Sequence, residues 1–579
     1  MMKRALILSC TVLLLATIGL AQKPSKVIGA GEGVANFRVP YHQTSNLTLS
    51  KDTIYVLTGW YFVDSLRTLT IQPGTVILGD SSSGGTLIIR RGAKIHAAGS
   101  ATAPIVFTSR KAAGQRRPGD WGGVLILGNA PTNKPLTQQV EGGFSTIPNS
   151  EAMYGGSDPD DSSGVLKYVR IEFAGIAFSQ DNEINGLTFG GVGRKTVIDH
   201  IQVSFANDDD FEFFGGTVDA KYLVSWRSLD DCFDTDFGYS GRLQFGVVKR
   251  DPSIFDASAS GSSNGFESDN EGASPYAATP RTNARISNFS VIGPAADSAA
   301  ANLLNAKWDH TAMLRRATEL SIYNSVLVGW KKGINLRDTL TQRAAIDGRL
   351  EIRNTSIAVP TTPILLSSSP STGNISGFDG LTWFSTAAFG NRGGTVRQST
   401  DLLPVTAFNL DNSFNPIPAA ASELATAGTA YNAGRLAGDT WFTQVSYRGA
   451  FDPTLPMSQQ WTAGWTNFDP QGTNYLTSVE TMTSVIPSDF TLEQNYPNPF
   501  NPATAIRFQL SAAGNVSLKI YDVLGRQVAT LVSGTRTAGS HVVQWDGRDD
   551  RGQAVSSGVY LYQLATGASV VTRKMMLTK

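Results

Sequence analysis

The sequence repeats with a period of about 22 residues, and this repeat constrains the fold more than any other feature. Residues 203–212 (VSFANDDDFE) align with residues 224–234 (VSWRSLDDCFD), which sets Phe211 22 positions before Phe233. A looser third copy (NGFESD) occupies residues 264–269. Repeats of this length, built from short strands and glycine turns, are typical of a parallel β-helix, in which each coil buries its apolar face only by stacking on its neighbours.

Short apolar strands, broken by Gly, Asn or Asp, continue through most of the chain, and 58 glycines with only 17% charged residues also favour a β protein. A flat β-sandwich is the alternative. It would favour two-residue hairpin turns such as Asn-Gly, and only Asn185 and Asn264 begin such a pair. The prediction is an all-β protein with a right-handed parallel β-helix over residues 45–475, interrupted by a turn or two of helix near residues 299–305.

The last part of this region differs from the repeats. Residues 360–400 are rich in Ser, Thr and Gly, residues 419–437 are rich in Ala, and both are interpreted as a cap or a long excursion. Aromatic residues gather at 447–453 and 461–470. They are expected to pack over the open end of the solenoid, because its last coil would otherwise expose an apolar face.

The N-terminus has the pattern of a secretory signal. Lys3 and Arg4 precede an apolar run, and small residues stand before Gln22, so cleavage is expected after Ala21. The alternative, an uncleaved anchor, would need a run of about 20 apolar residues. We expect residues 1–21 to be a signal peptide, residues 22–44 a lead-in, and no transmembrane segment after cleavage. Cys232 then remains alone, so packing rather than a disulfide must stabilise the fold.

The 48 basic and 48 acidic residues balance. A nucleic-acid-binding protein needs a basic excess to neutralise phosphates, so nucleic acid is not an expected partner.

A second domain is predicted at residues 488–579, after a linker at residues 476–487. Val516, Leu518 and Ile520 alternate with polar residues, which is the pattern of a half-buried strand. Six or seven such strands in about ninety residues predict a small Ig-like β-sandwich.

This domain resembles the C-terminal sorting domain of type IX secretion substrates. The similarity lies in the stretches YPNPFNP, LKIYDVLGR, AGSH with WDG, SGVY and the basic-ended tail. The motif residues are Tyr496, Pro497, Asn498, Pro499, Asp522, Gly525, Arg526, Gly558, Tyr560, Lys574 and Lys579. The resemblance implies that residues 488–579 bind the outer-membrane type IX translocon and sorting machinery. It also implies passage through the periplasm to a secreted or cell-surface location. An ordinary Ig-like adhesion module is the alternative.

The rest of the chain resembles large exported β-helix proteins that carry the same sorting domain. The matching stretches are residues 69–77, 121–129, 182–193, 208–216 and 461–468. That family tends to have Gly where this chain has Asp210, which adds a third acid to the turn. This resemblance implies a fold and a location but no activity.

Two acidic stretches, NDDDFEFFGG and LDDCFDTDFG, fall within the repeat. Equivalent residues of successive coils stack about 4.8 Å apart, which would place Phe211 on Phe233 and align the acids beside them. Two carboxylates at that spacing repel by about 1 kcal/mol in water and about 3–4 kcal/mol at an effective dielectric near 20. The acids therefore either extend into solvent, cap backbone N–H groups, or share a cation, for which Ca²⁺ is the candidate because it accepts carboxylate oxygens in a tolerant geometry. The candidate ligands are Asp208, Asp209, Asp230, Asp231, Asp234 and Asp236.

Two functions fit these features. The first is a non-catalytic, glycan-binding or adhesive protein of the cell surface, with extracellular glycans as partners. The second is a polysaccharide lyase or glycoside hydrolase that uses the acids of residues 208–236, with Asp231, Asp234 and Arg227 as candidate catalytic residues. A hydrolase needs two carboxylates about 5–10 Å apart, and a lyase needs a basic residue such as Arg227 or Lys249. The five histidines lack metal-ligand spacing, so a zinc site is not expected.

Overall fold

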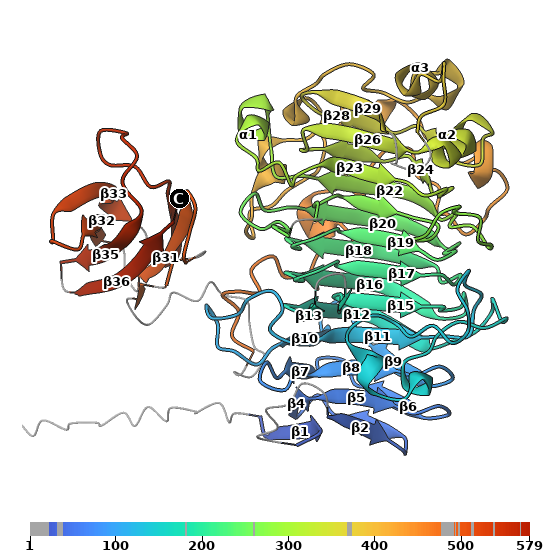
Figure 1. Ribbon diagram of the computed structural model, residues 1–579, viewed down its shortest axis with the longest axis horizontal. Helices are drawn as coiled ribbons and strands as arrows, with labels where there is room; N and C mark the ends of the chain where they lie inside the picture. Colours follow the sequence, from blue (N-terminus) through green and yellow to red (C-terminus); the bar gives the residue numbers. More distant parts are fainter. Residues whose placement is uncertain are drawn as a thin grey trace, which may run out of the picture. The chain divides into compact units, whose positions relative to one another are not determined.

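The computed structural model describes residues 23–31, 39–179, 182–258, 261–367, 373–475, 491–492, 494–495, 498–510, 514–536, 539–567 and 569–578. The chain forms two compact units, Met1–Ser478 and Val479–Lys579. The first contains long stacks of parallel strands and the second an antiparallel β-sandwich (Figure 1), which confirms the predicted fold. The expected signal peptide (residues 1–21) and linker (residues 476–487) lie outside the described residues. Within those residues, no helix combines the length and apolarity needed to span a bilayer.

One face of the β-helix is a parallel sheet, sheet B, to which each coil contributes one short strand. Its strands in spatial order are β2 (Pro40–Gln43), β5 (Trp60–Val63), β8 (Thr86–Ile89), β11 (Gly123–Leu127), β15 (Leu187–Gly190), β17 (Phe211–Phe214), β19 (Phe233–Asp236), β21 (Phe266–Ser268), β23 (His310–Leu314), β26 (Lys332–Arg337) and β29 (Thr362–Ser367).

Most of the other strands of the coils form sheet A. Its main path is β1 (Ser25–Gly29), β4 (Ile54–Thr58), β7 (Val76–Gly79), β10 (Ile105–Ser109), β12 (Gly164–Glu172), β16 (Val197–Ser204), β18 (Ala220–Trp226), β20 (Arg242–Lys249), β22 (Arg285–Ile292), β24 (Ser321–Tyr323) and β27 (Ile352–Arg353). Off this path lie β3 (Leu47–Leu49), β6 (Thr68–Ile71), β9 (Lys94–Ala98), β25 (Val326–Val328) and β28 (Ser356–Ala358).

The long strands of sheet A bend at one residue each. Tyr168, His200 and Tyr222 have positive φ angles of 49°, 56° and 63°, a left-handed conformation that is uncommon outside glycine. Their rings stack on one another with centroids 4.3 Å apart at both steps. Because of this bend, the two halves of one strand lie on two faces of the coil. The stacked rings stabilise the bend on the outer surface of the sheet.

The register of sheet B confirms the sequence repeat. Phe211 pairs with Phe233, and Phe233 pairs with Phe266. All three side chains are fully buried in the main hydrophobic core. The third copy is 33 residues from the second because the connection between β20 and β21, residues 250–265, is longer than the one between β18 and β19, residues 227–232.

The aromatic residues near the end of the first unit do not cover the open end of the solenoid, so that expectation was wrong. The return segment, residues 399–475, lies along the outer face of sheet A (Figure 1, orange). Gln244 Nε2 donates to the Thr443 carbonyl at 2.7 Å, and Gln202 Nε2 donates to the Asn467 carbonyl at 2.6 Å. Trp465 is fully buried and packs edge-on against Tyr168. Burial of these rings on an apolar sheet face is as favourable as burial on the open end of the solenoid. The sequence therefore does not show which of these two surfaces the rings cover.

The last coil is covered instead by residues 373–393. Phe384, at the end of helix α3 (Gly380–Phe384), joins the main core together with Ala344 and Ala345 of helix α2 (Thr339–Ile346). Helix α2 was not predicted. It begins at Asp338, whose carboxylate accepts from the N–H groups of Leu340 and Thr341, as a helix N-cap does. The short helix expected near residue 300 is α1 (Ser298–Asn302), and α4 (Glu423–Thr426) lies in the return segment.

A long connection between β11 and β12, residues 128–163, folds over the first strands of sheet B. We call it the insertion. Its Phe144 ring packs on Trp60, with centroids 4.7 Å apart, and Tyr154 packs on Phe214. A short antiparallel pair, β13 (Ala177–Ser179) and β14 (Asn182–Glu183), follows in the next coil.

The second unit contains two antiparallel sheets, β30–β31–β34 and β33–β32–β35–β36. Their strands are β30 (Thr491–Leu492), β31 (Thr504–Leu510), β32 (Gly514–Asp522), β33 (Gln527–Arg536), β34 (Gly539–Trp545), β35 (Gly558–Thr566) and β36 (Val570–Leu577). Alternate residues such as Leu518, Ile520 and Tyr562 are fully buried and form one core with Phe508 and Trp545, as expected of a β-sandwich.

Candidate functional site

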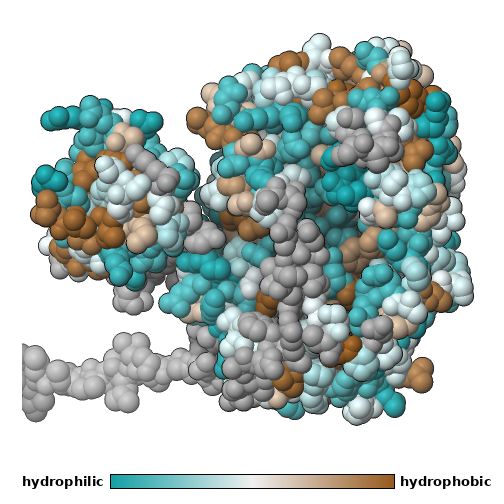
Figure 2. Space-filling view, viewed as in Figure 1, coloured by the Kyte–Doolittle hydropathy of each residue, from teal (hydrophilic) through white to brown (hydrophobic). Residues whose placement is uncertain are grey.

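The two large sheets of the β-helix differ in what covers them. The outer face of sheet A lies under the return segment, whereas the insertion covers the first strands of sheet B and the end of β17 at Phe214. On the next strands of sheet B, one outward position is occupied in successive coils by Glu212, Asp234 and Glu267. Part of the β-helix surface is recessed and lined by hydrophilic side chains in the view of Figure 2. The acids of sheet B are therefore the candidate site.

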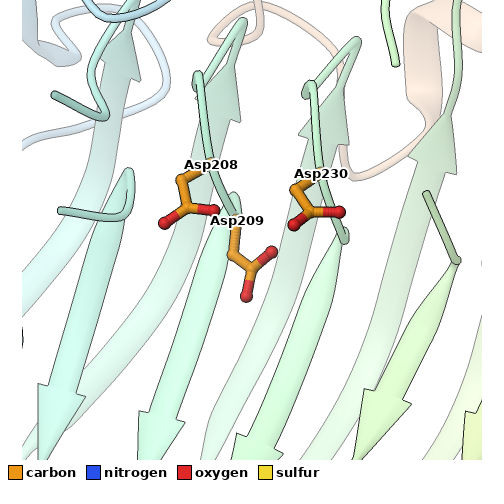
Figure 3. Close-up of side chains that lie close together, drawn as sticks. All are labelled: Asp208, Asp209 and Asp230. Carbon is orange, nitrogen blue, oxygen red and sulfur yellow. The ribbon is translucent and has the colours of Figure 1, made fainter. Parts of the chain in front are cut away.

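Carboxylates converge where the chain turns into β17 and β19. Asp208, Asp209 and Asp230 each place one oxygen within 4.8 Å of the others, side by side in Figure 3. Asp209, Glu212 and Asp234 form a second such group. We call these five residues the acidic cluster. Asp209 belongs to both groups, so it lies at the centre.

Asp209 and Asp231 also belong to a ladder that runs along the turn. The Asp209 N–H donates to Asn185 Oδ1, and the Asp231 N–H donates to Asp209 Oδ1 at 2.8 Å. The N–H of Asn264 donates to Asp231 Oδ1, and the N–H of His310 donates to Asn264 Oδ1. Each side chain thus accepts the backbone N–H of the next coil, which is the capping role that the sequence left open. Asp209 uses only one of its two oxygens in this way.

Burial and mutual repulsion shift the pKa values of the acids upward. Burial, followed by the charge of Glu267, raises the pKa of Asp209 to about 6. The pKa of Glu212 is raised well above its usual range by burial, then by Asp234 and Asp209. For Asp234 the causes are burial, then Glu267 and Asp209. These carboxyls thus resist carrying their negative charges together.

Several oxygens of the acidic cluster lack a donor. Glu212 Oε1, Asp230 Oδ1 and Asp234 Oδ1 are inaccessible to solvent and accept no hydrogen bond among the described residues. A buried carboxylate oxygen without a donor is costly unless it is protonated or bound to a cation. Oxygens on opposite sides of one Ca²⁺ lie about 4.8 Å apart, because each is about 2.4 Å from the ion. The cluster therefore fits the donor set and spacing that Ca²⁺ requires.

The positive charges near these acids are already engaged. Arg315 pairs with both Glu267 and Asp269, which together raise its pKa against the lowering effect of burial. Arg316 pairs with Asp269. Arg250, fully buried behind the turn, donates to Ser228 Oγ at 2.7 Å and to the carbonyls of residues 229 and 230.

The structure brings together four of the six predicted metal ligands: Asp208, Asp209, Asp230 and Asp234. Asp231 and Asp236 fall outside both groups: Asp231 belongs to the ladder, and Asp236 Oδ1 accepts from the N–H of Phe237 at 2.6 Å. Glu212 takes their place. The alternation along β17 was the signal for it, because Glu212 lies between the inward-facing Phe211 and Phe213.

Glu141 of the insertion also lies beside the cluster, and sequence reasoning missed it. Its Oε1 accepts from Asn185 Nδ2 at 3.0 Å. Burial, with the charges of Asp209 and Glu183, raises the pKa of Glu141 to about 8. Glu141 is 67 residues before Asp208 in the chain, and no repeat marks it, so the sequence carried no signal for this contact.

Arg227 does not join the acids. Its guanidinium pairs with Asp251, lies 4.6 Å over the Phe205 ring and reaches the Leu410 carbonyl under the return segment. Lys249 is fully buried there too, donates to the carbonyls of Arg250 and Gly293, and has its pKa lowered to about 7 by burial. Neither supplies a base next to Asp231 or Asp234.

Asp210, the residue that departs from the family pattern, points away from the cluster. It is fully buried and accepts from Ser225 Oγ at 2.5 Å. Burial raises its pKa to about 8. Its place near Arg250 and Cys232 is inside the coil, so it does not interfere with ligands on the surface.

The sorting-motif residues of the second unit occupy turns and strand ends. Asp522 and Arg526 pair at 2.7 Å across the turn that contains Gly525, and the Tyr560 hydroxyl donates to the Ser556 carbonyl at 2.7 Å. Asn498 Oδ1 accepts from the N–H of Met576 at 2.8 Å. Gly558 begins β35, and Lys574 lies on β36. Pro499 is described next to Asn498. The other three motif residues lie outside the described residues: Tyr496, Pro497 and Lys579.

Two solved structures match short parts of the chain. Dimeric latent PorU from Porphyromonas gingivalis is 20% identical over 16% of this chain and 10% of that chain, with a TM-score of 0.14. PorZ, an essential bacterial surface component of the type-IX secretion system of that organism, is 21% identical over 17% of this chain and 13% of that chain, with a TM-score of 0.12. The chain thus spans only 10% and 13% of these two chains.

No curated protein matches the chain. Residues 498–569 match the FlgD Ig-like domain, which agrees with the sandwich of the second unit. Residues 41–388 match the pectate-lyase-like β-helix domain. That match covers more than half of the 579 residues, and the chain therefore belongs to the family of pectate-lyase-like β-helix domains.

Proposed function

We propose that this is an exported, non-catalytic β-helix protein that binds glycans on the acidic side of sheet B and is stabilised there by Ca²⁺. One observation carries the proposal: the carboxylates of the acidic cluster lie close together, and three of their buried oxygens accept no hydrogen bond from the described residues. Carboxylates that stay close at this cost in a folded protein are expected to share a cation.

The cation would be held by the acidic cluster, whose oxygens suit the tolerant geometry of Ca²⁺. When bound, it would offset the repulsion among the carboxylates. The remaining acceptor oxygens of the acids can take hydrogen bonds from sugar hydroxyls. A hydrophilic recess in the β-helix surface suits a ligand rich in hydroxyl groups (Figure 2).

Cleavage of a polysaccharide is the second candidate, and one observation favours it. Burial raises the pKa of Glu141 to about 8, so Glu141 would keep its proton near neutral pH, as a general acid in a glycoside hydrolase must. Asp209 beside it, with a pKa of about 6, would be mostly ionised at that pH, as the second carboxylate must be. A lyase is less well supported. Arg227 lies elsewhere, and Arg315 beside the acids has a raised pKa, which opposes a role as a base.

The test is a calorimetric titration of the purified protein with Ca²⁺, followed by a panel of acidic and neutral glycans. Ca²⁺ should bind wild type, and Asp234→Asn should weaken that binding. The matched control is Asp160→Asn, because the Asp160 side chain is half exposed and pairs with Arg194 and Lys195 on the surface, outside the acidic cluster. Glycan binding without new reducing ends or unsaturated products supports the proposal, and products that disappear in Asp234→Asn support the enzyme. A protein that binds neither Ca²⁺ nor glycan rejects both.

The second unit is proposed to be the export address, recognised by the type IX translocon and sorting machinery. Support comes from the motif residues of its turns, such as the Asp522–Arg526 pair. Deletion of residues 488–579 should retain the protein in the periplasm, whereas wild type should reach the surface or the medium. Surface delivery of the truncated protein would contradict this role.

A further inference from the structure

The insertion (residues 128–163) contacts the early strands of sheet B through its middle part and later coils near its two ends. Phe144 packs on Trp60 and Phe62, with Val140 and Ala152 buried beside it. Two arginines of the coil hold the same region: Arg90 pairs with Glu151, and Arg91 donates to the Gly155 carbonyl. These contacts fix the middle of the insertion over the early strands, and Glu141 lies beside Asn185, at the turn before β15.

Glu141 meets the acidic cluster through Asn185. The Asn185 amide donates to Glu141 Oε1 at 3.0 Å, and its Oδ1 accepts from the N–H of Asp209 at 3.3 Å. The charge of Glu141 acts on Asp208 and Glu212 as well. Among the described residues, no lysine or arginine is found in contact with Glu141, so a third chain segment brings an uncompensated carboxylate to the cluster.

A second observation, on Glu212, favours a cation at this point. Glu212 is only 3% exposed, and its Oε1 accepts no hydrogen bond from any described residue. Its carboxylate lies within the group that it forms with Asp209 and Asp234. A buried oxygen in that position requires a proton or a cation.

We propose that Glu141 is a further ligand of the cation in the acidic cluster and that cation binding fastens the insertion onto sheet B. This inference depends on the Ca²⁺ site proposed above. One ion would then join three segments of the chain: the insertion and the turns before β17 and β19. The insertion contacts the strands on which a glycan would lie, so Ca²⁺ would set the shape of one wall of the binding surface.

The experiment is hydrogen–deuterium exchange of the full chain with and without Ca²⁺, together with calorimetric titration. In wild type, Ca²⁺ should slow exchange in peptides from residues 135–155. Glu141→Gln, which keeps an acceptor for Asn185, should lose this effect and bind Ca²⁺ at least about tenfold more weakly. The control Asp160→Asn, in the same insertion, should behave as wild type. Exchange outside the insertion checks that each variant folds.

Two results overturn the inference and are distinguishable. If wild type binds Ca²⁺ and Glu141→Gln binds it equally well, with equal protection of the insertion, the site stands but Glu141 is not a ligand. If wild type binds no Ca²⁺, the site itself and this inference are both rejected.

Discussion

The rings of Phe211 and Phe233 lie with centroids 4.7 Å apart and planes 1° from parallel. This is the geometry of one position in two successive coils, and the next residue of each strand faces outward. Glu212 and Asp234 are therefore held one coil apart by the same register. The aromatic stack that stabilises the core also forces these two carboxylates together.

Truncation of the stack should weaken both the fold and the site. Phe233→Ala removes a fully buried ring and should destabilise the first unit by about 3–5 kcal/mol. It should also weaken Ca²⁺ binding, because Asp234 is the next residue. Chemical denaturation followed by circular dichroism measures the first effect and calorimetry the second. Leu303→Ala, at an 88% exposed position, is the control, and a loss no larger than in this control would contradict the role of the stack.

Two substitutions at Asp209 separate its capping role from its charge. Asp209→Asn keeps an oxygen that can accept the N–H of Asp231 but removes the negative charge, so it should preserve stability without calcium and reduce the response to Ca²⁺. Asp209→Ala removes both the acceptor oxygen and the charge. It leaves the buried N–H of Asp231 without a partner, which should lower the free energy of unfolding by about 1–3 kcal/mol. Melting temperatures with and without Ca²⁺ test this. Equal stability of the two variants without calcium would show that the ladder hydrogen bond contributes nothing.

The stability of the calcium-free protein should fall as pH rises. The carboxyl pKa values of Asp209 and Glu141, about 6 and about 8, lie above the unfolded values near 4. A raised carboxyl pKa contributes stability that is complete below about pH 4 and lost as pH rises through the folded value. Calorimetric scans in chelator should therefore show a melting temperature that decreases between about pH 5 and pH 8.5.

Glu141→Gln removes the group with the higher of these two pKa values, so its melting temperature should depend less on pH in that range. Added Ca²⁺ should flatten the wild-type profile, because the bound ion favours the charged carboxylates. A wild-type profile in chelator that is flat, or that rises with pH, would contradict the pKa values on which this prediction depends.

The packing of the return segment should depend on the buried guanidinium of Arg448. Arg448 donates to the carbonyls of residues 390, 427 and 428 and to Ser356 Oγ, and burial lowers its pKa to about 10. Arg448→Lys keeps a charge but cannot reproduce this fork of donors, so several carbonyls should lose their partner. Limited proteolysis should then cut residues 399–475 faster than in wild type, while Arg110→Lys on the surface should have no effect. Unchanged proteolysis of Arg448→Lys would contradict this.

The fold could be predicted because its signals are local. The 22-residue repeat around Phe211 and Phe233 specifies strands that stack in register, and the alternation of Val516, Leu518 and Ile520 specifies a half-buried strand. The acids near Asp209 and Asp234 could be expected together for the same reason, since they share the repeat with the phenylalanines.

Contacts between segments that are distant in the sequence could not be predicted, because no periodicity marks them. Trp465 covers Tyr168 rather than the open end, Arg227 lies under the return segment, and Glu141 reaches the acids from another coil. Apolar burial is non-directional, so composition shows that Trp465 must be covered but not by what. The sequence by itself determined the strands, their register and the neighbouring acids, because these depend on periodicity. Only the tertiary structure decided which face stays open and which carboxylate completes the cluster, because both depend on where long irregular segments find space to pack.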